Sequence, residues 1–382
     1  MGNKKSTPWQ SKVPAHWSII PIGSAVSKKK KVIAPTLPTG AISFGKVILK
    51  KEAIPDSTRA TYQEVLPGDI LVNPLNLNYD LKSLRIALSL ISVCVSPGYF
   101  VMRPRETTHP TYLAYALHVF DVTHMKTLGA GIRQTVTYDL VAKELIALPP
   151  LPEQVRIADF LDRKTATIDV AIANKQELIA ALAKYREAVI AEAVAPREGW
   201  RTTASLSTAV KLKRVARIQS GDAISKKDMT LSGGIPVFGA NGQMGFTSAP
   251  NFPLGAICVG RVGSCGAVNA HDYPVFISDN ALVVKPLSTL DKSYLKYMLT
   301  SINYAPLINQ GAMPLLTGSG LAEVKVTVLP LTEQVRIADF LNRKTAAIDA
   351  ASVRAEKAVA MLKDYRASLI SEAVTGKLTI PE

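Results

Sequence analysis

The chain has 382 residues, of which 47% are hydrophobic, and a formal net charge of +15 at pH 7. Its length suits two or three domains with buried cores, and its charge favours a polyanionic partner, either nucleic acid or an anionic membrane face. Three cysteines are too few for a disulfide framework and predict a reducing, cytoplasmic compartment. The longest apolar run is too short to cross a bilayer. The N-terminus lacks the apolar core of a signal peptide.

Residues 1–150 are predicted to form a mixed α/β domain, with strands at 68–71 and 99–102 and a helix around 112–119. A run of lysines near its start is a candidate contact with phosphates, which gives affinity and salt dependence but does not read sequence. A solvated loop is the alternative. The lysines are Lys28, Lys29, Lys30 and Lys31, and Lys46 would extend the same surface.

Two further segments of this domain carry side chains that can pair with base edges, since Asn suits adenine and Arg suits guanine. The segment 73–85 is rich in Asn, and a plain turn is its alternative explanation. The loop 129–135 corresponds to 311–315 later in the chain, where such side chains are missing. The candidate DNA contacts are Asn76, Asn78, Lys82 and Arg85 in the first segment, and Arg133 and Gln134 in the second.

Residues 151–198 are predicted to form one long helix. Apolar residues recur along it at coiled-coil-like spacings, its interior holds neither Gly nor Pro, and Pro152 suits a first helical turn. A helix of about 40 residues is roughly 60 Å long. The apolar stripe consists of Leu161, Ile168, Ile172, Ile179, Leu182 and Val189.

Residues 199–330 are predicted to form a second mixed α/β domain, with a hairpin turn at Asn241-Gly242. A loop at 260–264 contains two glycines, which let the backbone approach a phosphate. Each polar side chain here has a plain surface position as its alternative. The candidate DNA contacts are Lys226, Lys227, Asn241, Gln243 and Arg261.

Residues 331–382 repeat the first helical segment. The letters EQVRIADFL stand at 153–161 and again at 333–341, and 25 of 44 aligned positions are identical between the two helices. The chain is therefore a tandem duplication of a divergent globular domain followed by a similar helix. The net charge is +9 and +6 in the two globular domains but −1 and +1 in the helical segments. This separation predicts that the domains contact nucleic acid and that the helices contact protein.

An apolar stripe on each long helix needs a partner, and the simplest partner is the other helix. We expect an α+β fold in which two mixed α/β target-recognition domains are separated by two long helices packed as an antiparallel coiled coil, with internal pseudo-twofold symmetry. Two unlike domains held at a distance set by helix length could read two different half-sites. A purely intrachain bundle is the alternative for the helices.

Polar and aromatic residues outside the stripe are the same in both helices, which suggests that one kind of partner docks twice. The predicted partner-binding residues are Gln154, Arg156, Phe160, Arg163, Tyr185 and Arg186 in the first copy, and Gln334, Arg336, Phe340, Arg343, Tyr365 and Arg366 in the second.

The sequence offers no convincing catalytic or metal-binding pattern. A phosphate-loop-like stretch ending at Lys46 has Val47 where Ser or Thr should hold magnesium. The Asn/Asp-Pro-Pro-aromatic tetrapeptide of amino-methyltransferases is missing. Cys258 and Cys265 lack a nearby ligand set, and the histidines do not cluster with acids, so we expect no catalytic residue and no metal site.

The chain resembles the specificity subunit of type I restriction–modification systems over nearly its whole length. The resemblance is carried by LPPLPEQVRIADFLDRKTATID at 148–169, LPLTEQVRIADFLNRKTAAID at 329–349, GIPVFGANGQMG at 234–245, and YLAYAL and YLKYML at 112–117 and 294–299. It implies a non-catalytic scaffold that binds two DNA methyltransferase subunits through its helices and directs them, with ATP-dependent restriction subunits, to a bipartite asymmetric site on double-stranded DNA. It also implies that S-adenosylmethionine, ATP and Mg belong to those partners, with no cofactor in this chain.

Two other functions stay open from the residues alone. One is a nuclease or methyltransferase with its own activity, which turnover by the isolated chain would reveal. The other is a coiled-coil adaptor without sequence-specific DNA binding.

Overall fold

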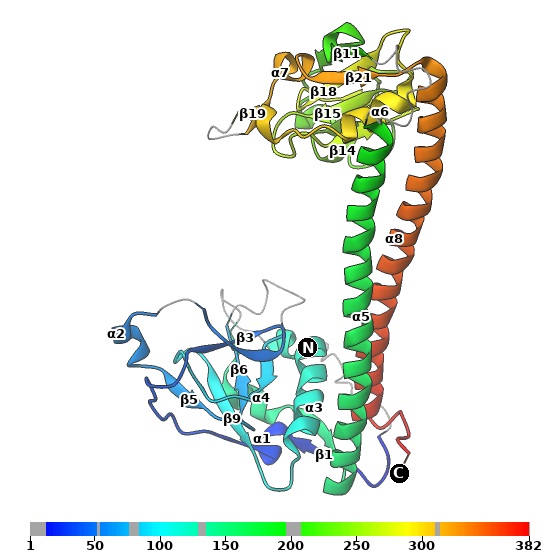
Figure 1. Ribbon diagram of the computed structural model, residues 1–382. Coiled ribbons are helices and arrows are strands. Elements are labelled where there is room, and N and C mark those ends of the chain that lie inside the picture. The colour runs from blue at the N-terminus through cyan, green and yellow to red at the C-terminus, as the bar shows by residue number, and fades with distance from the viewer. Residues whose placement is uncertain are drawn as a thin grey trace. The chain divides into compact units, whose positions relative to one another are not determined.

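The computed structural model describes residues 13–51, 54–75, 84–128, 135–195, 208–309 and 314–381 (Figure 1). The chain divides into two compact units: unit 1 is residues 1–175 with 358–382, and unit 2 is residues 176–357. Each unit contains one mixed domain together with parts of both long helices. None of the helices in the described ranges is long and apolar enough to span a membrane.

The domain of unit 1 is built on a four-stranded antiparallel sheet. Its order is β2 (Val26–Lys28), β9 (Phe100–Pro104), β6 (Ile70–Val72) and β7 (Ile86–Leu88). Successive residues of a strand face opposite sides. Ile70, Val72 and Met102 therefore pack with helix α3 (Pro110–Thr123), while Leu71 and Val101 pack against the pair β5 (Gln63–Val65) and β8 (Val93–Val95).

Shorter elements complete unit 1. β1 (Ser18–Pro21) pairs with β10 (Leu145–Leu148), and β3 (Gly40–Ser43) forms a hairpin with β4 (Lys46–Leu49). The hairpin tip needs left-handed backbone at Phe44 and Gly45, with φ of 47° and 73°. The remaining elements are α1 (Ile22–Ala25), α2 (Asp56–Arg59), η2 (Met125–Leu128) and α4 (Tyr138–Lys143).

The domain of unit 2 repeats this topology. Its four-stranded sheet has the order β12 (Ala216–Ser220), β18 (Ala281–Pro286), β15 (Ile257–Gly260) and β16 (Val268–Ala270), and α6 (Lys292–Thr300) follows β18 as α3 follows β9. β11 (Thr208–Lys211) pairs with β21 (Lys325–Val328) as β1 pairs with β10.

Unit 2 also has elements of its own. A second sheet has the order β14 (Gly242–Thr247), β13 (Ile235–Gly239) and β17 (Phe276–Ile277), and the short strands β19 (Ile308–Asn309) and β20 (Leu315–Leu316) pair with each other. The short helices are η4 (Leu212–Arg214), η5 (Lys226–Asp228), η6 (Ala305–Leu307) and α7 (Gly318–Ala322).

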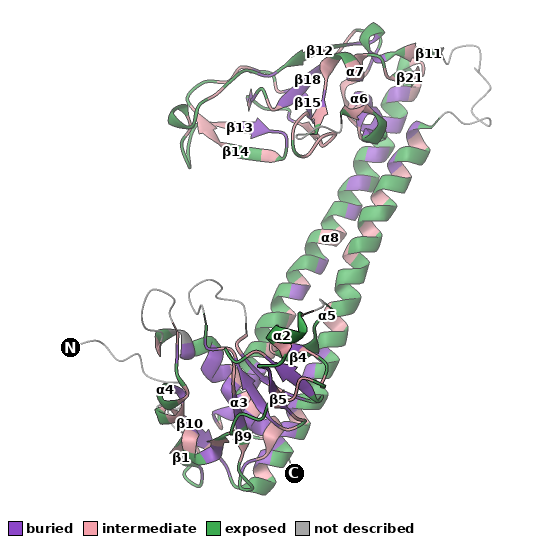
Figure 2. Ribbon diagram, turned by 90° about the vertical axis from the view of Figure 1, so that its left-hand side faces the viewer, coloured by how far each residue is buried: buried purple, intermediate pink, exposed green. Residues whose placement is uncertain are grey.

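The two long helices are α5 (Leu151–Val194) and α8 (Leu331–Val374), each of 44 residues. Buried residues recur along both between exposed ones, as the apolar stripe predicts (Figure 2). In unit 1 the start of α5 packs against the end of α8, with Leu161 and Ile168 in one core with Leu369 and Val374. In unit 2 the start of α8 packs against the end of α5 in the same antiparallel way. The predicted α+β fold with paired antiparallel helices is confirmed.

Candidate nucleic-acid and partner interfaces

The lysine run of unit 1 lies along a groove of about 540 Å³ that strand β9 and the start of α4 help to line. Lys28, Lys30 and Lys31 are exposed. The Nζ of Lys28 lies 5.6 Å from the centre of the Tyr138 ring, and Tyr99 lines the same groove. Cations beside aromatic faces are a combination that can hold a phosphate backbone and stack a base.

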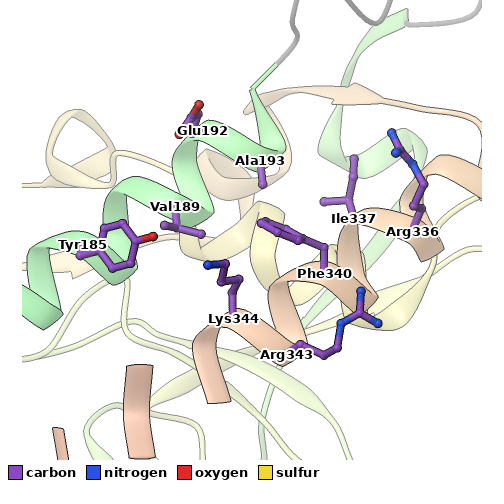
Figure 3. A pocket seen from close by; sticks show the side chains of 9 residues that line it. All are labelled: Tyr185, Val189, Glu192, Ala193, Arg336, Ile337, Phe340, Arg343 and Lys344. Atoms are coloured by element: carbon purple, nitrogen blue, oxygen red, sulfur yellow. The ribbon is translucent and has the colours of Figure 1, made fainter. Parts of the chain in front are cut away.

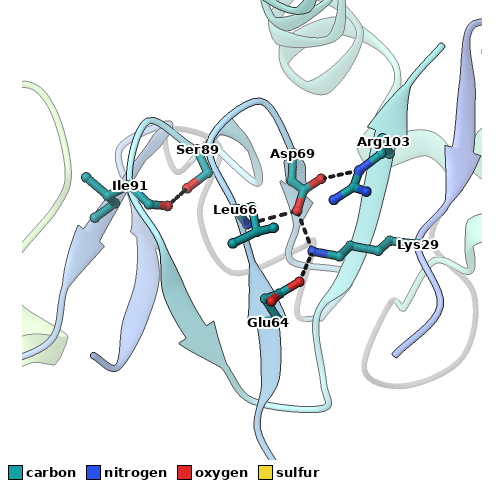
Figure 4. A network of polar contacts seen from close by, with 7 residues as sticks. All are labelled: Lys29, Glu64, Leu66, Asp69, Ser89, Ile91 and Arg103. Carbon is teal, nitrogen blue, oxygen red and sulfur yellow. Dashed lines mark hydrogen bonds and ion pairs between the residues drawn. The ribbon is translucent and has the colours of Figure 1, made fainter. Parts of the chain in front are cut away.

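Lys29 has a different role from the other three lysines, and the prediction that it contacts DNA is corrected. Its side chain is only 9% exposed, and its Nζ donates to Glu64 Oε1 over 2.7 Å and to Asp69 Oδ2 over 2.8 Å (Figure 4). Glu64 lies on β5 and Asp69 directly precedes β6, so the Lys29 side chain points into the protein. The ammonium group of Lys29 is ion-paired with two carboxylates of the protein and is therefore not available to bind a phosphate.

The other predicted contacts of unit 1 are placed as follows. Lys46 is exposed beside the β3–β4 hairpin tip. Arg85 is half-buried, and its backbone N–H donates to the buried Asp121 carboxylate. The remaining predictions lie outside the described residues, namely Asn76, Asn78, Lys82, Arg133 and Gln134.

In unit 2 the predicted hairpin forms and exposes polar tips. Asn241 and Gln243 are exposed at the turn between β13 and β14, where Gly242 has a φ of 105°. They line a concave surface of about 450 Å³ together with Gly263 and Asn280. Lys226 and Lys227 are exposed on η5.

Arg261 is half-buried beside this concave surface. Its Nη1 donates to Ser220 Oγ over 3.4 Å, and its backbone N–H donates to the Asn280 carbonyl over 3.0 Å. A Cβ on the preceding residue, Gly260, would lie 2.5 Å from the Ser264 carbonyl oxygen. Gly260 is therefore required because the loop backbone passes too close for a side chain. This requirement comes from a contact within the loop, whereas the sequence predicted an approach of the backbone to a phosphate.

Two exposed cations were missed by the sequence analysis. Arg103 on β9 and Lys285 on β18 occupy the same position of the equivalent strands, within VMRP and VVKP. The similarity of these two stretches was a signal, since a cation next to a buried strand residue, here Met102 or Val284, points to the opposite face of the sheet.

The helices of unit 2 form an amphipathic groove of about 510 Å³ (Figure 3). Phe340 is 41% exposed and Tyr185 is 49% exposed, so two aromatic rings face solvent across the helix pair. Cationic groups from Arg336, Arg343 and Lys344 line the same groove, with Glu192 as its one acidic residue. An exposed aromatic pair rimmed by charge is typical of a protein-binding surface.

The same residue types stand on the helices of unit 1. Arg156 and Arg163 are exposed, Tyr365 is 56% exposed, and Phe160 is half-buried with the Nζ of Lys164 lying 5.9 Å from its ring centre. The two units therefore present matching aromatic and cationic side chains, as the sequence predicts.

Gln154 and Gln334 do not fit the predicted partner-binding role, because both are buried and fully used within the chain. Gln154 Oε1 accepts the backbone N–H of His109, the N-cap residue of α3, over 2.8 Å, and its Nε2 donates to the Thr107 and Pro149 carbonyls. Gln334 does the same for Asp291, the N-cap residue of α6, over 2.7 Å. Each glutamine therefore holds the mixed domain of its unit against a long helix.

A tyrosine on each domain helix makes a second fastening. Tyr115 donates to Asp162 Oδ1 over 2.7 Å, and Tyr297 donates to Asn342 Oδ1 over 2.8 Å. Burial raises the pKa of Tyr115 to about 12, so its hydroxyl stays a donor at neutral pH.

Arg186 and Arg366 also act within the chain. The Nε of Arg186 donates to Asp349 Oδ1 over 2.9 Å, and the Nε of Arg366 donates to Asp169 Oδ1 over 2.8 Å. Each pair joins one long helix to the other, whereas the sequence analysis assigned both arginines to an external partner.

The described part of the chain contains no cluster of three or more His, Cys, Asp or Glu side chains that could hold a metal ion. Cys94 and Cys258 are buried, and burial raises the pKa of Cys258 to about 12, which keeps this thiol protonated and unreactive at neutral pH. His118 is held neutral, because burial and the nearby Arg366 charge lower its pKa to about 4.

The model of the family described as "Type I restriction modification DNA specificity domain" matches residues 82–180 and 206–356. The EcoprrI type I restriction enzyme specificity subunit of Escherichia coli is 26% identical over 160 residues, which span 42% of this chain and only 39% of that protein.

Two solved structures show the same fold. A chain from a study of complex assembly and conformational transition of the type I R-M system has a TM-score of 0.73 at 22% identity, over 96% of this chain and 100% of that one. The HsdS subunit from Thermoanaerobacter tengcongensis has a TM-score of 0.54 at 22% identity, over 96% and 98%. With a family match over more than half of its residues and the duplicated domain-and-helix architecture, the chain belongs to the type I restriction–modification DNA specificity family.

Proposed function

We propose that this chain is the DNA-recognition subunit of a multi-subunit methyltransferase and restriction complex, and that it binds a bipartite asymmetric site without catalysing a reaction itself. The observation that carries the proposal is a contrast between the two units. Their sheets have the same strand order and their domain helices are fastened by the same Gln and Tyr bonds, but their exposed tips differ.

Unlike tips on a common frame suit two readers of different sequences. Unit 1 offers Lys28, Lys30 and Lys31 along an aromatic-lined groove. Unit 2 offers the Asn241 and Gln243 amides at a hairpin tip. Lysines fix a duplex by its phosphates, and amide groups can pair with adenine in the major groove. One chain therefore contributes two separate half-site preferences.

Like surfaces on the helices suit one kind of partner bound twice. The family, together with a structure of similar fold from work on complex assembly of the type I R-M system, supports methyltransferase subunits as that partner. In unit 2 the docking site would be the groove around Phe340 and Tyr185, where aromatic anchors can enter a partner while the arginines pair with its carboxylates. S-adenosylmethionine, ATP and Mg would then be bound by the partners.

The recognition function is tested by mapping methylated bases in a host that expresses this chain with its methyltransferase partner. One two-part motif methylated only when both proteins are present is the expected result. The purified chain incubated with DNA and S-adenosylmethionine should give no turnover. Methyl transfer by the chain alone, or scattered methylation without a motif, would refute the proposal.

The docking function is tested by the double variant Phe160→Asp and Phe340→Asp. Loss of two aromatic anchors should weaken assembly with the methyltransferase at least about 30-fold. Val353→Asp is the matched control, because Val353 is 62% exposed on α8 and does not line the groove. Normal assembly of the double variant, or equal loss in the control, would contradict the docking site.

A further inference from the structure

The exposed Arg103 of unit 1 is held by a buried carboxylate. Its Nε donates to Asp69 Oδ1 over 3.0 Å; the arginine side chain is 51% exposed, while that of Asp69 is 1% exposed (Figure 4). This bond raises the pKa of Arg103, which keeps the guanidinium charged under all usual conditions.

Asp69 is also bound by groups other than Arg103. Its Oδ2 already accepts from Lys29 Nζ over 2.8 Å and from the Leu66 backbone N–H over 2.9 Å. A buried carboxylate with a buried ammonium partner and a backbone donor is paired. Lys29 also binds Glu64, so its one positive charge serves two carboxylates, and Arg103 supplies the second positive charge. The bond to Asp69 in turn fixes the otherwise mobile side chain of Arg103.

The bond also leaves the useful end of Arg103 available. Only Nε is used, and within the described ranges neither terminal nitrogen of the guanidinium makes a hydrogen bond. Two parallel N–H donors in a fixed plane suit a pair of acceptors, such as two phosphate oxygens or the O6 and N7 atoms of guanine.

Arg103 lies beside the lysine groove. Arg103 on β9 is paired with Ser27 on β2. Val101, two residues before Arg103 in β9, lines the groove. Through Asp69, Arg103 shares a carboxylate with Lys29, which also lines the groove. The arginine is therefore a neighbour of the groove, which offers exposed lysines and aromatic rings.

Unit 2 places a cation at the same strand position with a different support. Lys285 of β18 is exposed and paired across the sheet with Arg217. Its Nζ lies 5.0 Å from the centre of the Phe252 ring. The positive charge recurs in both units although the residues that hold it differ, which is expected when the charge itself serves binding.

We propose that Arg103 contacts DNA in unit 1 and that buried Asp69 is its positioning residue. This inference rests on the proposed function, and it assigns to the fixed guanidinium fork a paired acceptor on DNA, either at a phosphate or at a guanine edge. Asp69 affects DNA binding only through Arg103.

The test measures DNA affinity of the chain assembled with its methyltransferase partner. The probes are a fluorescent duplex that carries the motif found by methylation mapping and a duplex of scrambled sequence. Arg103→Gln should weaken cognate binding roughly 10- to 100-fold. Arg105→Gln, which removes the same charge from an exposed residue two positions on, should change it less than about 3-fold. Equal effects of the two variants would overturn the proposal.

The positioning role is tested in two backgrounds. Asp69→Asn should weaken binding in the wild-type chain but not further in Arg103→Gln, whereas an equal loss in both backgrounds would show a purely structural role. Glu64→Gln is the matched control, since it removes the charge of a Lys29 partner and leaves the Asp69–Arg103 bond intact. Binding of Arg103→Lys should be intermediate, because charge is kept and the fork is lost.

Two further readouts separate the outcomes. A phosphate contact reduces the salt slope of binding by about one and weakens both duplexes, whereas a guanine contact weakens the cognate duplex alone. If the wild-type complex does not prefer the cognate duplex, the proposed function fails; if it does and Arg103→Gln binds normally, only this inference fails.

Discussion

Arg366 donates through its Nε to Oδ1 of Asp169 over 2.8 Å and so ties α8 to α5 in unit 1. Arg186 and Asp349, the counterparts of these residues 180 positions away in the duplicated sequence, form the same pair over 2.9 Å in unit 2. The helix that supplies the arginine in one unit supplies the aspartate in the other. A duplicated helix thereby specifies its own antiparallel register twice.

Exchange of the two charges of the Asp169–Arg366 pair should leave the free energy of unfolding nearly unchanged. Asp169→Arg alone places two arginines together and should lower the free energy of unfolding by about 1 kcal/mol, because the pair is partly exposed. Asp169→Arg with Arg366→Asp should restore most of it. Urea unfolding measures the effect, and Asp364→Arg, at an exposed position of α8, is the control. A swap no better than the single variant would mean that the pair does not set the register.

The buried glutamines should matter more for stability than the exposed ion pairs. Gln154→Ala leaves the His109 N–H and two carbonyls without their partner and should lower the free energy of unfolding by about 3 kcal/mol. Gln176→Ala is the matched control, since Gln176 is exposed on the same helix. Equal unfolding midpoints in urea for the two variants would argue against the fastening role.

Neighbouring lysines should give opposite phenotypes. Lys30→Gln should reduce the salt slope of DNA binding by about one and leave stability unchanged, because Lys30 is exposed. Lys29→Gln should lower the free energy of unfolding by about 3 kcal/mol, because it leaves the Asp69 carboxylate buried without its ammonium partner. Salt titrations of binding and urea unfolding measure the two effects; the reverse pattern would refute the assignment.

The chain should lose stability as pH falls from 6.5 to about 4, because His118 stays neutral in the folded chain over this range. Burial and the Arg366 charge lower the pKa of His118 to about 4, whereas the unfolded chain has the ordinary value of 6.5. The unfolded state therefore binds more protons below pH 6.5, and stability falls toward pH 4 by up to about 3 kcal/mol. Urea unfolding at several pH values between 4 and 6.5 measures the free energy of unfolding, which should depend less on pH in His118→Gln than in the wild-type chain. An unchanged pH dependence would exclude His118 as its source.

Exchange of one domain should alter one half of the recognised motif. Replacement of residues 208–329 by the corresponding segment of another family member keeps unit 1 and both helices. The proposed function then expects one new half-site and one unchanged half-site in methylation mapping. A change in both halves would mean that the domains do not read DNA independently.

Local patterns in the sequence predicted the elements well, where the physical cause is local. The apolar stripe and the lack of interior Gly or Pro indicated both long helices, and Asn241-Gly242 indicated its hairpin, because helix periodicity and turn geometry depend on near neighbours. The exact repeat of EQVRIADFL also indicated the tandem duplication, and the bonds of Gln154 recur at Gln334.

The sequence by itself determined the duplication, the α+β class, the paired helices and the separation of charge between domains and helices. Only the tertiary structure decided which polar residues face outward. Lys29 meets Glu64 across 35 positions, Gln154 meets His109 across 45, and Arg366 meets Asp169 across 197. No local pattern marks these partners, because whether a charge or an amide is free depends on what folding brings beside it.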